Sequence, residues 1–398
     1  MVKGVFSKLY RVIDIFFHVL PVSEKKAFFI SFEGQYNDNP KAISLALRER
    51  HPDIKQYWCI TEKSKRNDIP DYIVQLNPQK ISYLWHKNRC KFIIDNSVGY
   101  YFFYDKNPNT IKKLLFNKKQ YNISTWHGFP IKAIGCKMIG NENWTYDTIH
   151  SSTNVLIAGS QKIKHIFEES FFNKFPVNLT GTPRNDILFN CDDKKVVQLK
   201  NKLHIELTKK VVLYAPTYRN NLQDSGVIQM TTMDLDTLFR SLNKKFGGEW
   251  VFVFRAHNLV LDAVEGFKSK KNNYLVSGNK FDDMADYLAV ADVLISDYSG
   301  CIIDCLLTSK PCFLYAHDYD DYTLKERGLE TPLDILPYSF SQTFNELIEN
   351  IKNYDQGLIN KKRMILLEQL GSVEDGRASE NVVNLIEAQM SSKNKKYD

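Results

Sequence analysis

The sequence has few of the patterns that usually hold a metal ion or a resident cofactor. Its nine histidines are scattered, its seven cysteines include no CxxC pair, and no predicted strand is followed by closely spaced glycines. Zinc sites need short, regular ligand spacings, and P-loops or dinucleotide-binding turns need glycine-rich loops. These absences argue against a metalloenzyme, an NTPase and a dehydrogenase. We therefore expect no metal site and no required cofactor, while binding of a divalent metal remains open.

Signals for nucleic-acid binding are also missing. There is no arginine-rich arm, paired zinc knuckle or aromatic RNA-binding motif, so we predict no nucleic-acid partner. The formal net charge of +7 instead favours nucleotides, phosphopolymers or acidic lipids as partners. The odd number of cysteines, three of them in the apolar stretch 301–312, fits a reducing cytoplasm.

Residues 1–24 are expected to be neither a signal peptide nor a membrane span. Asp14 and His18 interrupt the apolar run, and no small-residue cleavage site follows it. As an amphipathic helix, the segment would contact a membrane surface or pack on the protein's own body, and both interpretations remain open. Its apolar residues, predicted near one face, are Val2, Phe6, Leu9, Ile13, Phe16, Phe17 and Leu20, and Lys3, Lys8 and Arg11 are its basic ones.

The rest of the chain reads as two α/β domains. Apolar strand-like runs alternate with amphipathic helical patterns from AFFISF at 27–32 to PCFLYAH at 311–317, which is typical of parallel sheets. The alternation stops in the polar stretch 190–210. We therefore predict an N-terminal domain over 25–195, a second over 205–365 that faces it across a cleft, and a helical tail over 366–398 that crosses back.

The predicted second domain carries a candidate phosphate site at its strand ends, where open parallel sheets bind ligands. One strand ends in Asp297 and Ser299, and Gly300 then starts a helix whose first amides would suit a phosphate. Asp304, one turn later, would accept hydrogen bonds from ribose hydroxyls. The alternative is that Ser299 only caps the helix and Asp304 favours its dipole.

Two further strand ends of this domain carry basic residues. Thr217 and Arg219 follow one strand, and Arg255 and His257 follow another. Each alone is most simply a surface arginine or a structural histidine. Together at one edge they would neutralise a departing nucleotide, so we predict that they bind the donor phosphates.

The first domain offers a candidate base in STWHGFPIK, at 124–132. His127 follows a predicted strand, with Gly128 in the turn behind it, and a structural histidine is the alternative. Lys132 is either a solvated lysine or a contact for an acceptor phosphate. Other strand-end residues that would line or support the acceptor side are Asp38, Asn39, Asp95, Asn96 and Arg184, although Asp38 and Asn39 also mark a helix start, and Asn185 or Asp186 also reads as a helix cap.

The ordered blocks of this sequence resemble one known family. WHGFPIK, GTPRND, LYAPTYR, RAH, SDYSGCIID and FLYAHDYDDYTLKERGL are similar to the CDP-glycerol glycerophosphotransferases, which build teichoic acids and related capsule polymers, and SFEGQYNDNPKAI resembles that family's first strand and loop. The resemblance runs from about residue 28 to about residue 330. It implies the two-domain GT-B fold, with two Rossmann-like sheets.

The same resemblance implies an activity and roles for residues. Glycerol phosphate would pass from CDP-glycerol to a hydroxyl of a lipid-linked saccharide or polyol-phosphate acceptor, with release of CMP, at the cytoplasmic face of the membrane. His127 is implied as the general base, His257 as a contact to the donor phosphates, and Ser299, Gly300 and Asp304 as the nucleotide site. The alternatives are a GT-B glycosyltransferase that uses a nucleotide sugar, and an inactive membrane-docked scaffold.

Three residues depart from the family's usual pattern. Phe129 stands where a threonine is common, Asn258 replaces a usual proline, and Gly300 replaces a usual second serine. Phe129 and Gly300 touch the predicted site, so these departures bear on substrate identity. The chain otherwise resembles the family's short, single-unit members, among which are primases and capsule enzymes.

Overall fold

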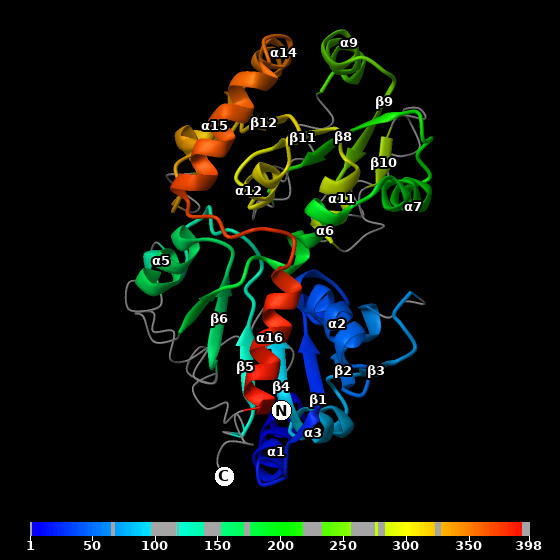
Figure 1. Cartoon of the computed structure of the whole chain (residues 1–398), viewed down its shortest axis with the longest axis vertical. Coiled ribbons are helices and arrows are strands. Elements are labelled where there is room, and N and C mark those ends of the chain that lie inside the picture. The colour runs from blue at the N-terminus through cyan, green and yellow to red at the C-terminus, as the bar shows by residue number, and fades with distance from the viewer. Residues whose placement is uncertain are drawn as a thin grey trace. The chain divides into compact units, whose positions relative to one another are not determined.

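The computed structural model describes residues 2–64, 68–96, 117, 119–138, 153–170, 176–217, 233–255, 275–277, 283–322 and 328–391. The chain divides into two compact units, each built around one parallel sheet (Figure 1). Unit 1 comprises Met1–His127, Asn141–Asp186 and Ser372–Asp398, and unit 2 comprises Gly128–Gly140 and Ile187–Gly371. The predicted α/β class with two parallel sheets is confirmed.

In the described part of unit 1, the sheet has seven strands in the order β3-β2-β1-β4-β5-β6-β7. Successive strands add to one side of β1 as far as β3, and from β4 onward they add to the other side. The carboxyl ends of β1 and β4 therefore form a topological switch point, where such sheets usually bind ligands. The strands are β1 Ser23–Ile30, β2 Lys55–Cys59, β3 Ile73–Leu76, β4 Cys90–Asp95, β5 Tyr121–Ser124, β6 Val155–Ala158 and β7 Val177–Leu179.

Helices cover both faces of this sheet, and strand alternation divides its core in two. In β1, Ala27 and Phe29 belong to the cluster under α2 and α16, whereas Phe28 and Ile30 belong to the cluster with α1 and α3. Figure 1 shows α16 beside α2, and the two helices are in contact. The helices of unit 1 are α1 Val2–Phe17, α2 Asp38–Arg50, α3 Ile81–Lys87, α5 Gln161–Ser170 and α16 Ala378–Ser391.

The helix α1 packs on unit 1 by one face and exposes apolar side chains on another. Ile13 and Phe17 pack against the cluster that contains Phe28, and the buried Asp14 accepts hydrogen bonds from Lys87 and Asn88. Among the described apolar residues, the predicted face is thus partly covered by unit 1, at Ile13 and Phe17, and partly exposed, at Leu9 and Phe16. The apolar residues exposed from the middle of the helix to just beyond its end are Leu9, Val12, Ile15, Phe16 and Val19.

The described strands of unit 2 form a six-stranded sheet in the order β10-β9-β8-β11-β12-β13, so its switch point lies between β8 and β11. Its main core lies under α9 and α14, where side chains such as Leu238 and Leu347 meet Phe252, Ile295 and Phe313 of the strands. The strands are β8 Lys210–Ala215, β9 Trp250–Phe254, β10 Leu275–Ser277, β11 Val293–Ser296, β12 Cys312–Tyr315 and β13 Ser339–Ser341.

Several helices of unit 2 begin at caps that are visible in the sequence. Asp192, Asp234 and Asp355 each accept a backbone N–H at a helix start, and Thr343 forms a capping box with Glu346. The helices are α6 Asp186–Asn190, α7 Asp193–Leu203, α9 Leu235–Phe246, α11 Met284–Val290, α12 Cys301–Asp304, α13 Tyr319–Asp321, α14 Phe344–Lys352 and α15 Gln356–Gln369.

The limits of the two units differ from the predicted domain limits in two places. The chain passes into unit 2 after Asp186, whereas the sequence placed the boundary between 195 and 205. The segment Gly128–Gly140, which was expected in the first domain, belongs to unit 2. Beyond Gly371 the chain is part of unit 1 again, where Ser372 bridges to Ser160 and α16 follows.

Candidate functional site

His127 lies at the carboxyl edge of the unit 1 sheet, three residues after β5 ends at Ser124. Its ring nitrogen Nδ1 is 3.0 Å from the backbone oxygen of Asn96, the residue that follows β4. Its imidazole stacks on the indole of Trp126, with ring centres 4.6 Å apart. Trp126 adopts a φ of 52°, a left-handed conformation that is uncommon for a residue with a side chain. The ring of His127 is therefore oriented by two neighbours.

Asn39 joins three segments of this edge. It is fully buried, and its amide nitrogen donates to the backbone oxygens of Thr125 and Trp126, at 3.2 and 3.1 Å. Its side-chain oxygen accepts the backbone N–H of Arg184 at 3.0 Å. A buried amide that bonds on both sides is a structural clip. Asn39 thus supports the turn that carries His127.

Asp38 and Arg184 form an ion pair beside this clip. Asp38, with a φ of 59°, accepts from Arg184 Nη1 at 3.2 Å and from Asn96 Nδ2 at 2.7 Å. The same Arg184 nitrogen donates to the backbone oxygen of His127 at 2.7 Å. The backbone oxygen of Asp95, at the end of β4, accepts the backbone N–H of Thr125 at 2.7 Å. The structure therefore brings four predicted acceptor-side residues, Asp38, Asn39, Asp95 and Arg184, to one edge.

Asp186 caps a helix, but not the helix that follows it in sequence. Its carboxylate accepts the backbone N–H groups of Ala378 and Ser379, at 2.9 and 2.8 Å, where α16 begins. Burial raises the pKa of Asp186, and the hydrogen bonds from Ser379 and Ala378 partly offset that shift. A sequence pattern cannot identify a cap for a helix that lies almost two hundred residues later.

In unit 2, Asp297 organises the turn after β11. Its Oδ1 accepts the backbone N–H of Thr217 at 2.8 Å and that of Tyr298 at 2.6 Å, and the side chain is buried. Because it joins the ends of β8 and β11, it lies at the switch point of this sheet. Ser299 Oγ accepts the backbone N–H of Cys301 at 3.4 Å, which makes it a weak cap.

The helix that begins at Cys301 is short. It has four residues and continues as a 3₁₀ turn over Cys305–Leu307. A single turn adds little macrodipole, so phosphate binding here would depend on backbone amides and nearby cations. Asp304 is buried in this turn, and its contact with a ribose remains a prediction.

Gly300 allows a close approach between two loops of unit 2. A Cβ atom at this position would lie 2.9 Å from the backbone oxygen of Phe129, closer than real Cβ contacts. The loop that carries Phe129 is held by backbone hydrogen bonds to residues 328–331: Ala133 donates to Gly328, and Glu330 donates to Ile131, at 2.9 and 2.8 Å. Two of the three departures from the family pattern, Phe129 and Gly300, therefore meet in space.

The remaining predicted residues are placed less completely. Arg255 lies with its guanidinium 4.8 Å from the ring centre of Tyr287, and Lys132 lies with its ammonium 5.7 Å from that of Tyr322. Gly128 has a φ of 131°, as its turn requires. Arg219 and His257 lie outside the described residues, as does Asn258.

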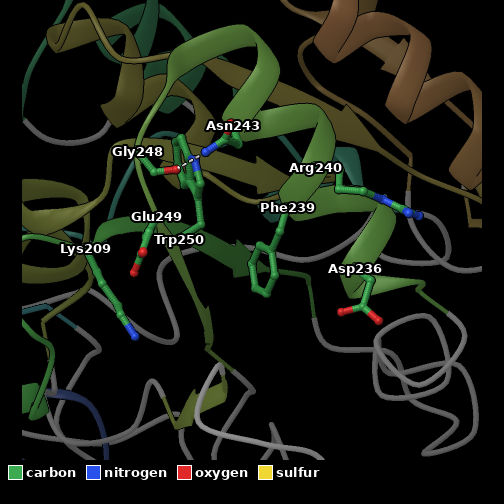
Figure 2. Close-up of a pocket in the computed structure, with 8 residues that line it drawn as sticks. All are labelled: Lys209, Asp236, Phe239, Arg240, Asn243, Gly248, Glu249 and Trp250. Atoms are coloured by element: carbon green, nitrogen blue, oxygen red, sulfur yellow. Dashed lines mark hydrogen bonds between the residues drawn. The ribbon is translucent and has the colours of Figure 1, made fainter.

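A pocket of about 660 Å³ lies elsewhere in unit 2, at the amino-terminal ends of β8 and β9 (Figure 2). Figure 2 shows the hydrogen bond from Asn243 to the backbone oxygen of Gly248, which measures 2.6 Å. Asp297 lies at the other end of these strands, so this pocket is not the predicted donor site. The pocket is lined by Lys209, Asp236, Phe239, Arg240, Asn243, Gly248, Glu249 and Trp250.

The described part of the chain contains no cluster of side chains that would hold a metal ion: no group of three or more histidines, cysteines or acidic residues is placed there to do so. All seven cysteines are free, and burial raises the pKa of the Cys301 thiol to about 12.

Sequence reasoning missed how Trp126, Ser31 and Asn96 contribute to the unit 1 edge. Trp126 stacks on His127, and Ser31 accepts from Asn96 Nδ2 at 3.1 Å. Asn96 had been considered only as a lining residue, whereas its backbone oxygen contacts the histidine ring. Their positions directly after strands were the only signal in the sequence.

Comparisons with known proteins agree with this architecture. The structure of the wall teichoic acid polymerase TagF matches with a TM-score of 0.78 at 24% sequence identity, over 98% of this chain and 96% of that one. At this identity the match shows the fold alone, two Rossmann-like units of the GT-B type. The predicted fold class is thereby confirmed.

Sequence relatives cover most of the chain. The teichoic acid poly(glycerol phosphate) polymerase of Bacillus subtilis is 28% identical over 97% of this chain and 52% of its own length. The teichoic acid glycerol-phosphate transferase of Staphylococcus aureus is 26% identical over 90% of this chain and 92% of its own length. The chain thus spans about half the length of the first two polymerases it matches.

The family comparison covers nearly the same residues. The family described as CDP-glycerol:poly(glycerophosphate) glycerophosphotransferase matches residues 13–388, which include both sheets and both candidate edges. The chain belongs to the CDP-glycerol:poly(glycerophosphate) glycerophosphotransferase family.

Proposed function

We propose that the chain transfers an alditol phosphate from a CDP-alcohol to a hydroxyl of a lipid-linked or polymer acceptor. Glycerol phosphate is the first candidate for the transferred group. One observation carries the proposal: in a chain that matches this family from residue 13 to 388, His127 lies at a strand-end edge with its ring held by the Asn96 oxygen. A relative's structure, that of a TagF variant soaked with CDPG, supports a CDP-alcohol as donor.

The proposed step is an in-line attack of the acceptor hydroxyl on the β-phosphorus of the donor. A new bond forms between the acceptor oxygen and this phosphorus, the bond to the bridging oxygen of the α-phosphate breaks, and CMP leaves. His127 takes the hydroxyl proton. Phosphoryl transfer depends mostly on positioning and charge neutralisation, and a well-placed base adds ~10² to 10⁴ in rate.

Residues of unit 2 are proposed to bind the donor. Arg255, Arg219 and His257 would neutralise the phosphates, while Thr217, Ser299 and Gly300 would offer backbone or hydroxyl groups. Asp297 would hold the turn, and Asp304 would accept from the ribose. No step requires a cofactor, and transfer in the presence of excess EDTA tests whether a divalent metal contributes.

The direct test is a donor panel with product identification. CDP-glycerol, CDP-ribitol and UDP-sugars are offered to the full chain with a lipid-linked saccharide or polyol-phosphate acceptor, and released nucleotides are separated. We expect CMP with a CDP-alcohol and an acceptor heavier by one alditol phosphate. Release of UDP from a sugar donor, without CMP from either CDP-alcohol, would replace the proposal with glycosyl transfer.

We further propose peripheral binding to the cytoplasmic face of the membrane through α1. No helix in the described part of the chain has the length and apolar character to cross a bilayer. Leu9, Val12 and Phe16 nevertheless present exposed apolar side chains, while Ile13 and Phe17 anchor the helix to unit 1. Exposed apolar side chains on an anchored helix suit the interface of a bilayer.

The anchored face of α1 determines how membrane binding should be tested. Deleting residues 1–22 would weaken vesicle binding but would also uncover the core cluster under Ile13 and Phe17. The triple substitution of Leu9, Val12 and Phe16 by serine leaves that cluster covered. We expect this variant to lose flotation with anionic vesicles and to keep transfer to a soluble acceptor. Unchanged flotation would leave α1 with a structural role only.

A further inference from the structure

The contact between His127 and Asn96 defines which ring nitrogen carries the proton. A backbone carbonyl oxygen can only accept a hydrogen bond, and it lies 3.0 Å from Nδ1. In a neutral imidazole only one nitrogen carries hydrogen, so this contact selects the tautomer with the proton on Nδ1. Nε2 is then the basic nitrogen. The chemistry of the histidine therefore depends on where the Asn96 oxygen is held.

The position of that oxygen is controlled by the Asn96 side chain. Asn96 is almost completely buried, and its Nδ2 donates to Asp38 Oδ2 at 2.7 Å and to Ser31 Oγ at 3.1 Å. Its backbone N–H donates to the oxygen of Ile30 at 3.3 Å, which continues the pairing of β4 with β1. Backbone and side chain are both anchored, so the carbonyl presents one direction to the histidine.

The second carboxylate oxygen of Asp38 is linked to the backbone of the same histidine through Arg184. Asp38 Oδ1 accepts from Arg184 Nη1 at 3.2 Å, and that nitrogen donates to the backbone oxygen of His127 at 2.7 Å. Asp38 is thus linked to the ring of His127 through Asn96 and to its backbone through Arg184. Its left-handed backbone, with a φ of 59°, places the carboxylate between the two.

We propose that Asp38 is a positioning residue that selects Nε2 of His127 as the proton acceptor. Asp38 acts through its neighbours. It holds the Asn96 amide and the Arg184 guanidinium, and through them the direction and the tautomer of the ring. The proposed function determines only which group gives its proton to Nε2, namely the acceptor hydroxyl. The tautomer of His127 follows from the structure without it.

The test combines a spectroscopic readout with kinetics on the full chain. Asp38→Asn keeps the shape of the side chain but replaces one acceptor oxygen by a donor and removes the charge that faces Arg184. With ¹⁵N-labelled histidine, we expect the His127 signals of the parent to report an Nδ1–H tautomer, and those of the variant a mixture. We expect kcat with CDP-glycerol to fall about 100-fold, since small misplacements of a catalytic group cost that much, with KM changed less than threefold.

Two further variants separate positioning from folding. Arg184→Lys releases the His127 backbone oxygen and leaves the Asp38 to Asn96 bond, so kcat should fall while the tautomer signals stay those of the parent. Asn96→Ser removes the side-chain anchor and should shift the tautomer as Asp38→Asn does. It therefore provides the same test if Asp38→Asn does not fold. Glu387→Gln is the matched control, because Glu387 contacts His51 at 2.6 Å in the same unit; it should change neither readout.

The outcomes distinguish this inference from the proposed function. If Asp38→Asn and Asn96→Ser, both folded, keep the parent tautomer signals and the parent kcat, Asp38 has no positioning role, and CDP-glycerol transfer stands. If the parent shows no CDP-glycerol transfer but its tautomer responds to both substitutions, the positioning role stands and the assigned reaction fails.

Discussion

The carboxyl edges of the two sheets are built in different ways. In unit 1, side chains do the joining: Asn39, Asn96, Asp38 and Arg184 connect loops that follow four different strands. In unit 2, the described contacts at the edge involve backbone groups more often: the Asp297 carboxylate accepts two backbone N–H groups, and Gly300 lies against the backbone oxygen of Phe129. The two edges therefore tolerate different substitutions.

This difference matches the tasks we propose for the two edges. A general base must hold one nitrogen in a defined direction, and buried amides and an ion pair restrict a side chain to one direction. A phosphate is bound by backbone N–H groups, arginines and a close approach of the chain, which glycine permits. Removing atoms should thus harm the first edge most, and adding atoms should harm the second.

The largest expected effect comes from His127→Ala. Loss of the base should lower kcat by ~10² to 10⁴, while the affinity for CDP-glycerol stays near that of the parent, because the proposed donor residues all belong to unit 2. CMP release and calorimetric titration with CDP-glycerol measure the two quantities. His165→Ala, which removes a largely exposed histidine of α5 in the same unit, is the control.

A loss of CDP-glycerol affinity equal to the loss of kcat would contradict the division of tasks. It would mean that the unit 1 edge also binds the donor. Normal turnover of His127→Ala would remove this histidine from the mechanism.

Asn39→Ala should give the next effect, on stability. The change leaves the oxygens of Thr125 and Trp126 and the N–H of Arg184 without the clip, at a site that is fully buried. Unsatisfied buried groups cost ~1 to 3 kcal/mol each, so we expect the free energy of unfolding to fall by about 3 kcal/mol in urea titrations. Asn243→Ala, which removes one exposed amide in unit 2, should cost under about 1 kcal/mol.

Equal stability losses for Asn39→Ala and Asn243→Ala would break the comparison from the unit 1 side. The buried hydrogen bonds of Asn39 would then contribute no more to stability than one exposed hydrogen bond. Another contact would have to orient His127.

Gly300→Ala tests the unit 2 edge by adding a single carbon. Its Cβ would meet the Phe129 oxygen at 2.9 Å, so one loop must move, and overpacking of this kind costs ~1 to 3 kcal/mol. We expect a lower melting temperature and a higher KM for CDP-glycerol. Gly328→Ala is the control, since a Cβ there meets nothing within 4 Å. An unchanged KM in Gly300→Ala would show that this approach does not shape the donor site.

Much of the fold could be predicted because its signals are local. Runs such as AFFISF and VVLYA contain the aromatic and β-branched residues of buried strands, and polar residues begin where each strand ends. His127 and Asp297 were found in this way, as residues that closely follow strands. The positions of the edges thus follow from the strand pattern alone.

What the sequence could not predict depends on contacts between distant segments. Arg184 reaches Asp38 across 146 positions, and no residue pattern records that pair. The loop at Gly128–Gly140 joins unit 2 through backbone hydrogen bonds to residues 328–331. Such bonds do not depend on the identity of the side chains, so the sequence carries no sign of them. The end of α12 could not be predicted either, because its buried apolar residues continue into a 3₁₀ turn.

The smallest expected effect concerns pH and the junction at Asp186. Burial raises the pKa of this carboxyl in the folded state, so the protonated form is favoured by folding. Its contribution to stability is fully present below the unfolded pKa of about 3.8 and is lost as the pH rises through the higher folded value. Asp186→Asn cannot titrate, so the stability difference between parent and variant should favour the parent more at acid pH than at neutral pH. Urea titrations at several pH values measure this difference. A difference that does not change with pH would mean that burial does not determine the pKa of Asp186 and that its hydrogen bonds to α16 dominate.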